Sequence, residues 1–220
     1  MVITKDLHSG LISWRISPTF REIAYAEPMP QVIAIDIPIG LPDHGPRECD
    51  REARHLLRPR RASSVFPAPI RPILSAVSCA DACRLRRQIE GKGISLQTWG
   101  IIPKVREVDD AIRQDPALEL RVREVHPEVC FCFLAGGKAP GRSKKTKSGQ
   151  KERRKLLEPV FGRWLRDALD ALGNLSCAQD DLLDAFVALW TAERIASGKA
   201  HTIPASPPQD LFGLCMKIVV

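Results

Sequence analysis

The sequence predicts an α/β protein in which a mixed sheet is flanked by helices. Short β-branched segments recur along the chain, and segments with helical periodicity stand between them. The length of 220 residues is enough for one well-buried core or for a core with an inserted lobe. We therefore expect a single domain over residues 1–220 with helical insertions.

The strands are predicted from apolar runs that end at turn residues. Residues 1–6 and 11–16 have the pattern of a hairpin with its turn at 8–10. The run 32–35 is continuously apolar and ends at Pro38 and Gly40, as expected for a strand covered on both faces. Further strands are expected from Leu120 and, at an edge, in 210–220.

The helices are predicted from caps and from the spacing of apolar residues. Ser17 and Pro18 provide a start for a short first helix, and the other helices are expected over about 46–57, 78–90, 105–113, 151–158, 162–172 and from 179 onward. The proline-rich segment 63–75 is predicted to be a loop, because proline disrupts both helices and central strands.

The charge of the chain favours polyanionic partners. The chain has 33 Lys and Arg against 26 Asp and Glu, a formal net charge of +7, and the excess concentrates in 47–71 and in Gly136 to Lys155. The second tract is interpreted either as a solvated, mobile loop or as a site of phosphate contact. The candidate phosphate-binding residues are Arg60, Arg61, Lys144, Lys145 and Lys147.

The cysteines and the N-terminus bear on the compartment. The chain has seven cysteines, an odd number with no CxxC pair, which predicts reduced, structural thiols in a cytoplasmic protein. The N-terminus has no basic segment followed by an apolar core, and no window approaches the roughly 18 apolar residues of a membrane span. Neither secretion nor a membrane partner is indicated.

Carboxylates stand at the ends of several predicted elements. Asp6 ends the first strand, Asp36 follows the apolar run 32–35, and Glu124 lies near the end of the strand from Leu120. Each is either a turn residue or a member of a charged site at a strand end.

The last long helix opens with three aspartates, of which Asp181 and Asp184 share one face at the spacing i, i+3. Capping explains one or two of the three but explains Asp184 poorly, since it lies about one turn inside an otherwise apolar helix. Clustered carboxylates repel one another unless a cation lies between them. Because the candidate ligands are oxygens, Mg²⁺ or Mn²⁺ is the expected ion.

Several motifs together resemble the DUF429 family, whose members are predicted nucleases with a ribonuclease H-like fold. They are Asp6 with Gly10, the strand IAIDIPIGLP, the block CDREARHLLRPRRASSVFPAP, the segment EVHPE, and DDLLDAFVALWTAERI. The resemblance covers nearly the whole chain. It implies that Asp6, Asp36 and Asp184 hold two metal ions, with Glu124 and Asp181 as further catalytic residues. The hairpin is about one strand shorter than the family pattern, which predicts a smaller sheet.

The function implied by the resemblance is two-metal hydrolysis of phosphodiester bonds in nucleic acid. His126 is interpreted as a packed turn residue or as a proton-transfer group. The alternatives are a non-catalytic module that binds nucleic acid or protein, and an enzyme acting on a small phosphorylated substrate. Aromatic residues make up only 5% of the chain, which weighs against recognition of single strands by stacking.

Overall fold

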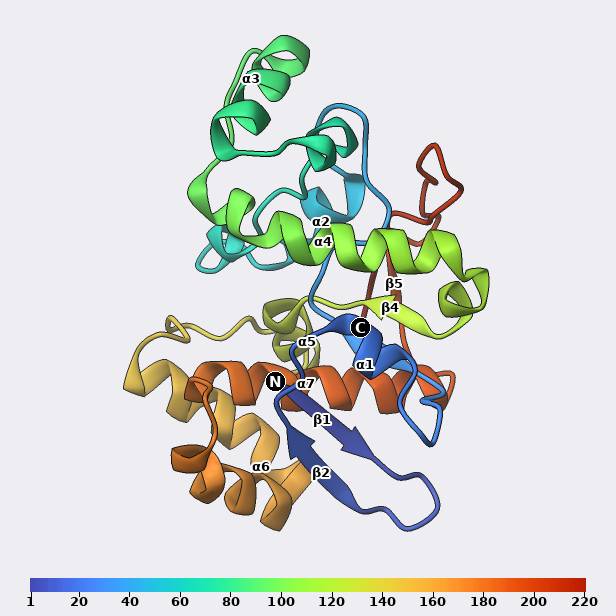
Figure 1. The fold of residues 1–220 in the computed structure, drawn as a ribbon. Helices are drawn as coiled ribbons and strands as arrows, with labels where there is room; N and C mark the ends of the chain where they lie inside the picture. The colour runs from blue at the N-terminus through green and yellow to red at the C-terminus, as the bar shows by residue number, and fades with distance from the viewer.

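The computed structural model describes residues 1–220 as a mixed α/β arrangement of helices around small sheets (Figure 1). The strands are β1 (Val2–Lys5), β2 (Ile12–Arg15), β3 (Ile33–Ile35), β4 (Val122–Glu124), β5 (Thr202–Ile203) and β6 (Ile218–Val219). The α-helices are α1 (Phe20–Ala24), α2 (Glu48–Leu56), α3 (Cys79–Glu90), α4 (Leu96–Gln114), α5 (Pro127–Leu134), α6 (Lys147–Asp170) and α7 (Gln179–Ala196). Short 3-10 turns are η1 (Ala62–Ser64), η2 (Arg71–Ser75), η3 (Pro116–Leu120) and η4 (Ala171–Asn174).

The strands pair into three two-stranded sheets instead of the single mixed sheet that the sequence predicts. The β1–β2 hairpin and the β5–β6 pair are antiparallel, and β3–β4 is parallel. The strands have between two and four residues, so each pair forms only a short ladder. In Figure 1, β4 lies between α4 above and α7 below, and the hairpin lies beneath α7.

The parallel β3–β4 pair brings two strand ends to one edge. Ile35 is in register with Glu124, and the Val125 N–H donates to the Ile35 carbonyl at 2.9 Å. The chain leaves β3 at Asp36 and leaves β4 through His126 into α5. Since the carboxyl ends of parallel strands are a common location of ligand sites, this edge is the first place to search for one.

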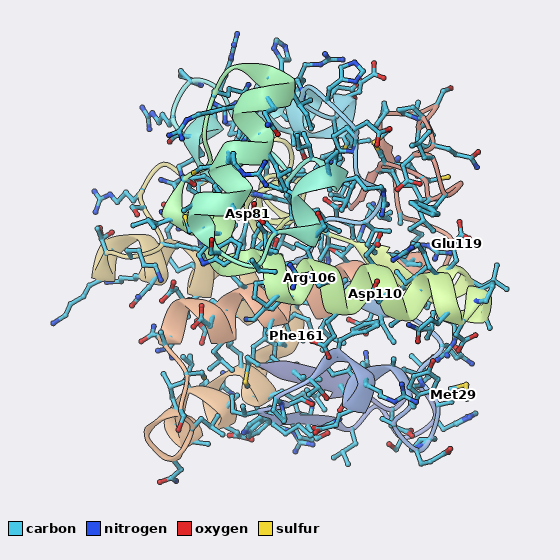
Figure 2. The ribbon with its side chains drawn as sticks, turned by 45° about the horizontal axis from the view of Figure 1, so that its top comes forward. Met29, Asp81, Arg106, Asp110, Glu119 and Phe161 are labelled. Atoms are coloured by element: carbon cyan, nitrogen blue, oxygen red, sulfur yellow. The ribbon has the colours of Figure 1, made fainter.

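The main hydrophobic core lies beneath this edge. Its largest contributions come from α5, α6 and α7, and Phe161 of α6, labelled in Figure 2, packs on Phe186 of α7 with ring centroids 5.1 Å apart. Burial of such aromatic side chains stabilises the contact between these helices. No helix of the chain combines the length and the apolar character that crossing a membrane requires.

Residues 70–102 form a smaller helical region with its own core. Ile70, Ile73, Ala76, Ala82 and Ile102 are buried together there. Figure 2 shows α3, with Asp81, above α4, with Arg106. The Arg106 guanidinium donates to the Ala76 carbonyl at 3.0 Å, which ties α4 to the segment that precedes α3.

The predicted helices are mostly present, with three differences. The helix predicted at 105–113 begins nine residues earlier, at Leu96, because Ser95 caps its N-terminus and Pro103 is accommodated inside it. The helices predicted at 151–158 and 162–172 form one element, α6, kinked at Gly162, where φ is 47°. Helix α5 is not predicted from the sequence, since six of its residues are buried and no polar face reveals a helical period.

The interpretation of Gly136 to Lys155 as one mobile loop is wrong for its second half. Thr146 caps α6 by accepting from the Gly149 N–H at 3.1 Å, so residues 147–155 form the first turns of that helix. Arg153 is fully buried. The composition indicated a solvated segment, but tertiary partners override it.

Glu124 is the centre of a buried ion-pair cluster and not a free catalytic carboxylate. The Arg47 guanidinium donates to both Glu124 oxygens at 2.6 and 2.7 Å and to Asp50 at 2.7 and 3.2 Å. The Ile39 N–H also donates to Glu124 at 2.6 Å. All three charged side chains are buried, so Glu124 fixes the loop after β3 against β4, and its predicted catalytic role is corrected to a structural one.

Replacing Arg47 tests this assignment. Arg47→Met leaves Glu124 and Asp50 buried without their cation, so we expect a loss of about 3 to 5 kcal/mol in the free energy of unfolding, measured by urea denaturation. Arg84→Met is the matched control, because its pair with Asp81 is exposed, and it should cost less than about 1 kcal/mol. Equal, small losses in both variants would contradict the structural role.

Candidate active site

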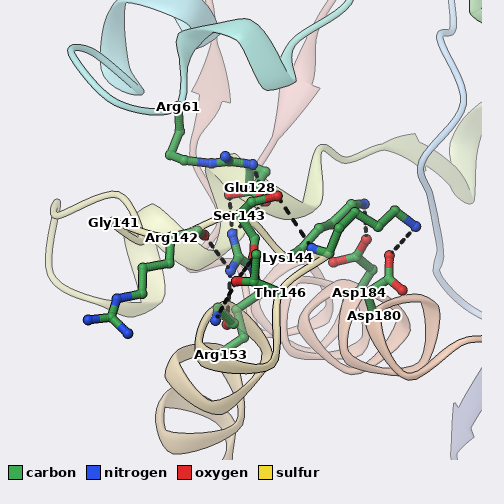
Figure 3. Close-up of polar contacts among 12 residues, drawn as sticks. Arg61, Glu128, Gly141, Arg142, Ser143, Lys144, Thr146, Arg153, Asp180 and Asp184 are labelled. Carbon is green, nitrogen blue, oxygen red and sulfur yellow. Dashed lines mark hydrogen bonds and ion pairs between the residues drawn. The ribbon is translucent and has the colours of Figure 1, made fainter.

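Asp36 directly follows β3, and α7, which carries Asp184, packs against β3. Lys144, from the segment before α6, donates to Asp184 Oδ2 (Figure 3), and its charge also acts on Asp36. The charge of Asp36 in turn raises the pKa of Asp184. The structure thus brings together two of the three predicted metal ligands with one of the predicted phosphate-binding lysines.

Both carboxyl groups have a raised pKa. Desolvation raises the pKa of Asp184 to about 6, with Asp36 and Glu128 adding to the rise and Lys144 opposing it. Desolvation likewise raises the pKa of Asp36 to about 6, although Asp36 keeps an exposed surface. Water on that open side screens the charge of Asp36, whereas the side chain of Asp184 is only 12% exposed and is screened less.

A second lysine–aspartate pair lies beside the first. The Lys145 ammonium is 2.6 Å from Asp180 Oδ2, and Asp180 and Asp184 are one turn apart on α7. Asp181, the predicted partner of Asp184, is exposed and forms no ion pair. The predicted i, i+3 pair of Asp181 and Asp184 is therefore replaced by Asp180 and Asp184, at the spacing i, i+4. The sequence could not distinguish the two pairs, because residues at both spacings share a helix face.

Glu128 is the charged residue that sequence reasoning missed. Its two oxygens accept from Arg153 at 2.6 and 2.7 Å, and one of them accepts from Arg61 at 3.3 Å (Figure 3). The charge of Glu128 acts on Asp36 and Lys144. Its position in the first turn of α5, directly after Pro127 at the helix start, was the signal that could have identified it.

The segment that carries the lysines is fixed by backbone contacts. Glu152 accepts from the Gly141 and Arg142 N–H groups at 2.9 and 3.1 Å, and Arg153 donates to the Arg142 carbonyl at 3.0 Å. A Cβ on Gly149 would lie 2.0 Å from the Ser143 carbonyl oxygen, so only glycine allows this close approach. The backbone at 141–149 is therefore built rigidly against α6.

Asp6 lies outside the cluster, and its predicted role as a metal ligand is corrected. Asp6 Oδ1 accepts from the His8 and Ser9 N–H groups at 3.0 and 2.6 Å in an exposed hairpin turn. These hydrogen bonds lower the pKa of Asp6. The neighbouring Lys5 pairs with Glu193, nine residues beyond Asp184 on α7. Nine helical residues correspond to roughly 13 Å, so the hairpin turn projects from the other end of the helix.

The predicted phosphate-binding residues divide into two groups. Arg61 and Lys144 are paired with Glu128 and Asp184. Lys147 and Arg60 are exposed and form no ion pair, while Lys145 is 69% exposed despite its contact with Asp180. Arg60 reaches the same region, because its guanidinium lies 3.1 Å from where a Cβ on Gly141 would stand. The exposed cations are therefore Arg60, Lys145 and Lys147.

The acidic oxygen donors at this edge are the carboxylates of Asp36 and Asp184. No three His, Cys, Asp or Glu side chains are arranged to hold a metal ion, and the predicted third ligand, Asp6, is remote. Asp184 Oδ1 is buried with no hydrogen-bond partner, so it retains a free acceptor. Two carboxylates fit Mg²⁺ or Mn²⁺, which commonly take one or two protein carboxylates and complete their coordination with water and phosphate oxygens.

Two other features lie near this edge. His126 precedes α5, its Nδ1 is buried without a partner, and desolvation lowers its pKa. A cavity of about 310 Å³ lies on the β4 and β6 side, lined by Ile39, Val122, Arg123 and Leu214 among others. It excludes Asp36 and Asp184, so we assign the candidate site from the charged cluster and not from cavity size.

The comparisons with known proteins give a family and nothing more specific. The family model described as "Protein of unknown function (DUF429)" matches residues 1–209. No curated protein matches the chain. No solved structure matches it either.

The raised pKa of Asp184 predicts a pH dependence of stability. Between about pH 4 and pH 6 the unfolded chain releases this proton before the folded chain does, so this group lowers stability as pH rises through that window. Asp184→Asn removes the effect, and its melting temperature relative to wild type should be higher at pH 7 than at pH 4.5. Asp181→Asn, at an exposed position, should show no such difference. If the melting temperature of wild type instead rises relative to that of Asp184→Asn as pH increases, Asp184 acts as a helix-capping residue.

Proposed function

We propose a function for this chain, which belongs to the DUF429 family of proteins of unknown function: it is a nuclease that depends on Mg²⁺ or Mn²⁺ and hydrolyses phosphodiester bonds. The observation that carries the proposal is the pair Asp36 and Asp184, with one unpartnered carboxylate oxygen and lysines beside it. Such hydrolysis requires two parts: acidic groups that bind a metal ion, and cations beside them that bind the phosphate.

Asp36 and Asp184 are the residues that would hold the ion. When bound, such an ion lowers the pKa of a water molecule and stabilises charge on phosphate oxygens. The exposed cations Arg60, Lys145 and Lys147 would position the nucleic-acid backbone. Arg60 lies just before η1, Lys145 just before α6, and Lys147 at the first position of α6. Binding by these side chains contacts phosphate and carries no base preference.

We also propose that the fold is a reduced ribonuclease H-like arrangement. The support is that β1 and β3 both pack against α7, which carries Asp184, while β3 pairs in parallel with β4. The two-stranded hairpin agrees with the smaller sheet that the sequence predicts.

A second candidate is a non-catalytic module that binds nucleic acid. The observation in its favour is that Lys144 and Lys145 pair with Asp184 and Asp180, so each of these acids already has a cation beside it. The two functions differ in their need for metal, because a binding module requires no divalent ion.

Substitution of the acids decides between the two functions. Asp36→Asn and Asp184→Asn should each reduce Mn²⁺-dependent cleavage of a panel of single- and double-stranded DNA and RNA by at least about 100-fold. The controls are Asp6→Asn and Asp181→Asn, which change acids outside the cluster and should retain cleavage. Equal loss in controls and test variants, or binding with no cleavage under any metal, would remove the nuclease proposal.

The salt dependence of binding tests the exposed cations. Each phosphate contact contributes about 0.7 to 0.9 log units of affinity per log unit of salt. Reversal of Lys145 and Lys147 to Glu should therefore flatten the slope measured by fluorescence anisotropy with a labelled oligonucleotide. The control reverses Lys104 and Lys199, which lie outside the cluster, and should leave the slope unchanged. An unchanged slope in the test variant would show that these lysines do not contact phosphate.

A further inference from the structure

Lys144 and Lys145 are adjacent in the chain but differ in their surroundings. The side chain of Lys144 is 29% exposed and donates to Asp184, while that of Lys145 is 69% exposed and meets Asp180 from the solvent side. The charges of Asp184, Asp36 and Glu128 all act on Lys144. The ammonium of Lys144 is thus the cation within the acidic cluster.

The position of this ammonium is set by the fold. Thr146 donates to the Ser143 carbonyl at 2.8 Å, and the close approach of Gly149 to Ser143 leaves the turn no room to shift. The Arg153 guanidinium, itself fully buried, donates to the Arg142 carbonyl on the other side of Lys144. The backbone is fixed on both sides of Lys144, so only its flexible side chain is free to leave the acids.

The charges of this cluster balance when no ion is bound. The positive charges of Arg61, Arg153 and Lys144 equal in number the negative charges of Glu128, Asp36 and Asp184. Because both arginines pair with Glu128, Lys144 is the cation beside Asp36 and Asp184. An ion that enters between them meets both the attraction of the acids and the repulsion of the ammonium, and close charges are weakly screened where water is scarce.

We infer that Lys144 is a built-in cation that occupies the divalent-ion position at Asp36 and Asp184, so that Mg²⁺ or Mn²⁺ binds in competition with its ammonium. This inference rests on the proposed function, because it takes that ion as the ligand. The lysine keeps the acids paired while no ion is bound. Once displaced, its side chain is free to reach a phosphate oxygen held by the same ion.

Calorimetric titration with MnCl₂ alone, without nucleic acid, tests the competition. Lys144→Gln should bind Mn²⁺ at least about tenfold more tightly than wild type, because the repelling charge is gone. Lys144→Arg should remain close to wild type, and Lys145→Gln should change affinity by less than about threefold, since Lys145 contacts Asp180 outside the pair. If wild type binds Mn²⁺ and Lys144→Gln binds it with equal or weaker affinity, the inference is overturned. The proposed function is then left intact.

Absence of Mn²⁺ binding in both wild type and Lys144→Gln would instead remove the proposed function, and the inference with it.

A second measurement uses the wild-type protein and does not depend on the folding of a variant. Lysine labelling by an acylating reagent, quantified by mass spectrometry, should increase at Lys144 on addition of Mn²⁺ and stay constant at the exposed Lys147. Unchanged labelling at Lys144 in the presence of bound Mn²⁺ would contradict displacement.

Discussion

The buried ion pair between Glu128 and Arg153 is the interaction on which the candidate site depends. The side chains are 3% and 0% exposed, and both oxygens of Glu128 are bonded to the same guanidinium nitrogen. Removal of one partner would leave a buried charge without compensation, which makes such a pair hard to break once the chain has folded. The pair joins the start of α5 to the first turns of α6.

The same arginine connects this pair to the site. Arg153 also donates to the carbonyls of Arg142 and Gly149, both at 3.0 Å, and so holds the ends of the turn that carries the two lysines. The placement of Lys144 against Asp184 is thus a consequence of where α5 and α6 meet. A disturbance of Glu128 would move the lysines without touching either aspartate.

The sequence predicts the elements better than it predicts the charges. The hairpin, β3, β4, α3 and α7 follow from local patterns of apolar residues and caps, and these patterns survive because packing agrees with them. The unusual positions of Asp36 and Asp184 in the sequence predict that they are site residues. Asp6 and Glu124 have equally suggestive positions in the sequence, but Asp6 forms a turn and Glu124 meets Arg47, a partner 77 residues away in the chain. No local pattern reveals a distant partner.

The ion pairs around α7 separate into a permanent part and an exchangeable part. The arginine pairs of Glu128 are buried, so they belong to the fold. The lysine ends of the pairs with Asp180 and Asp184 are partly open to water, so these lysines are screened more than the buried arginines. A ligand that exchanges with the lysines would therefore change the charge of the site while the arginines keep the backbone in place. This division allows one cluster to be stable without a ligand and still receptive to one.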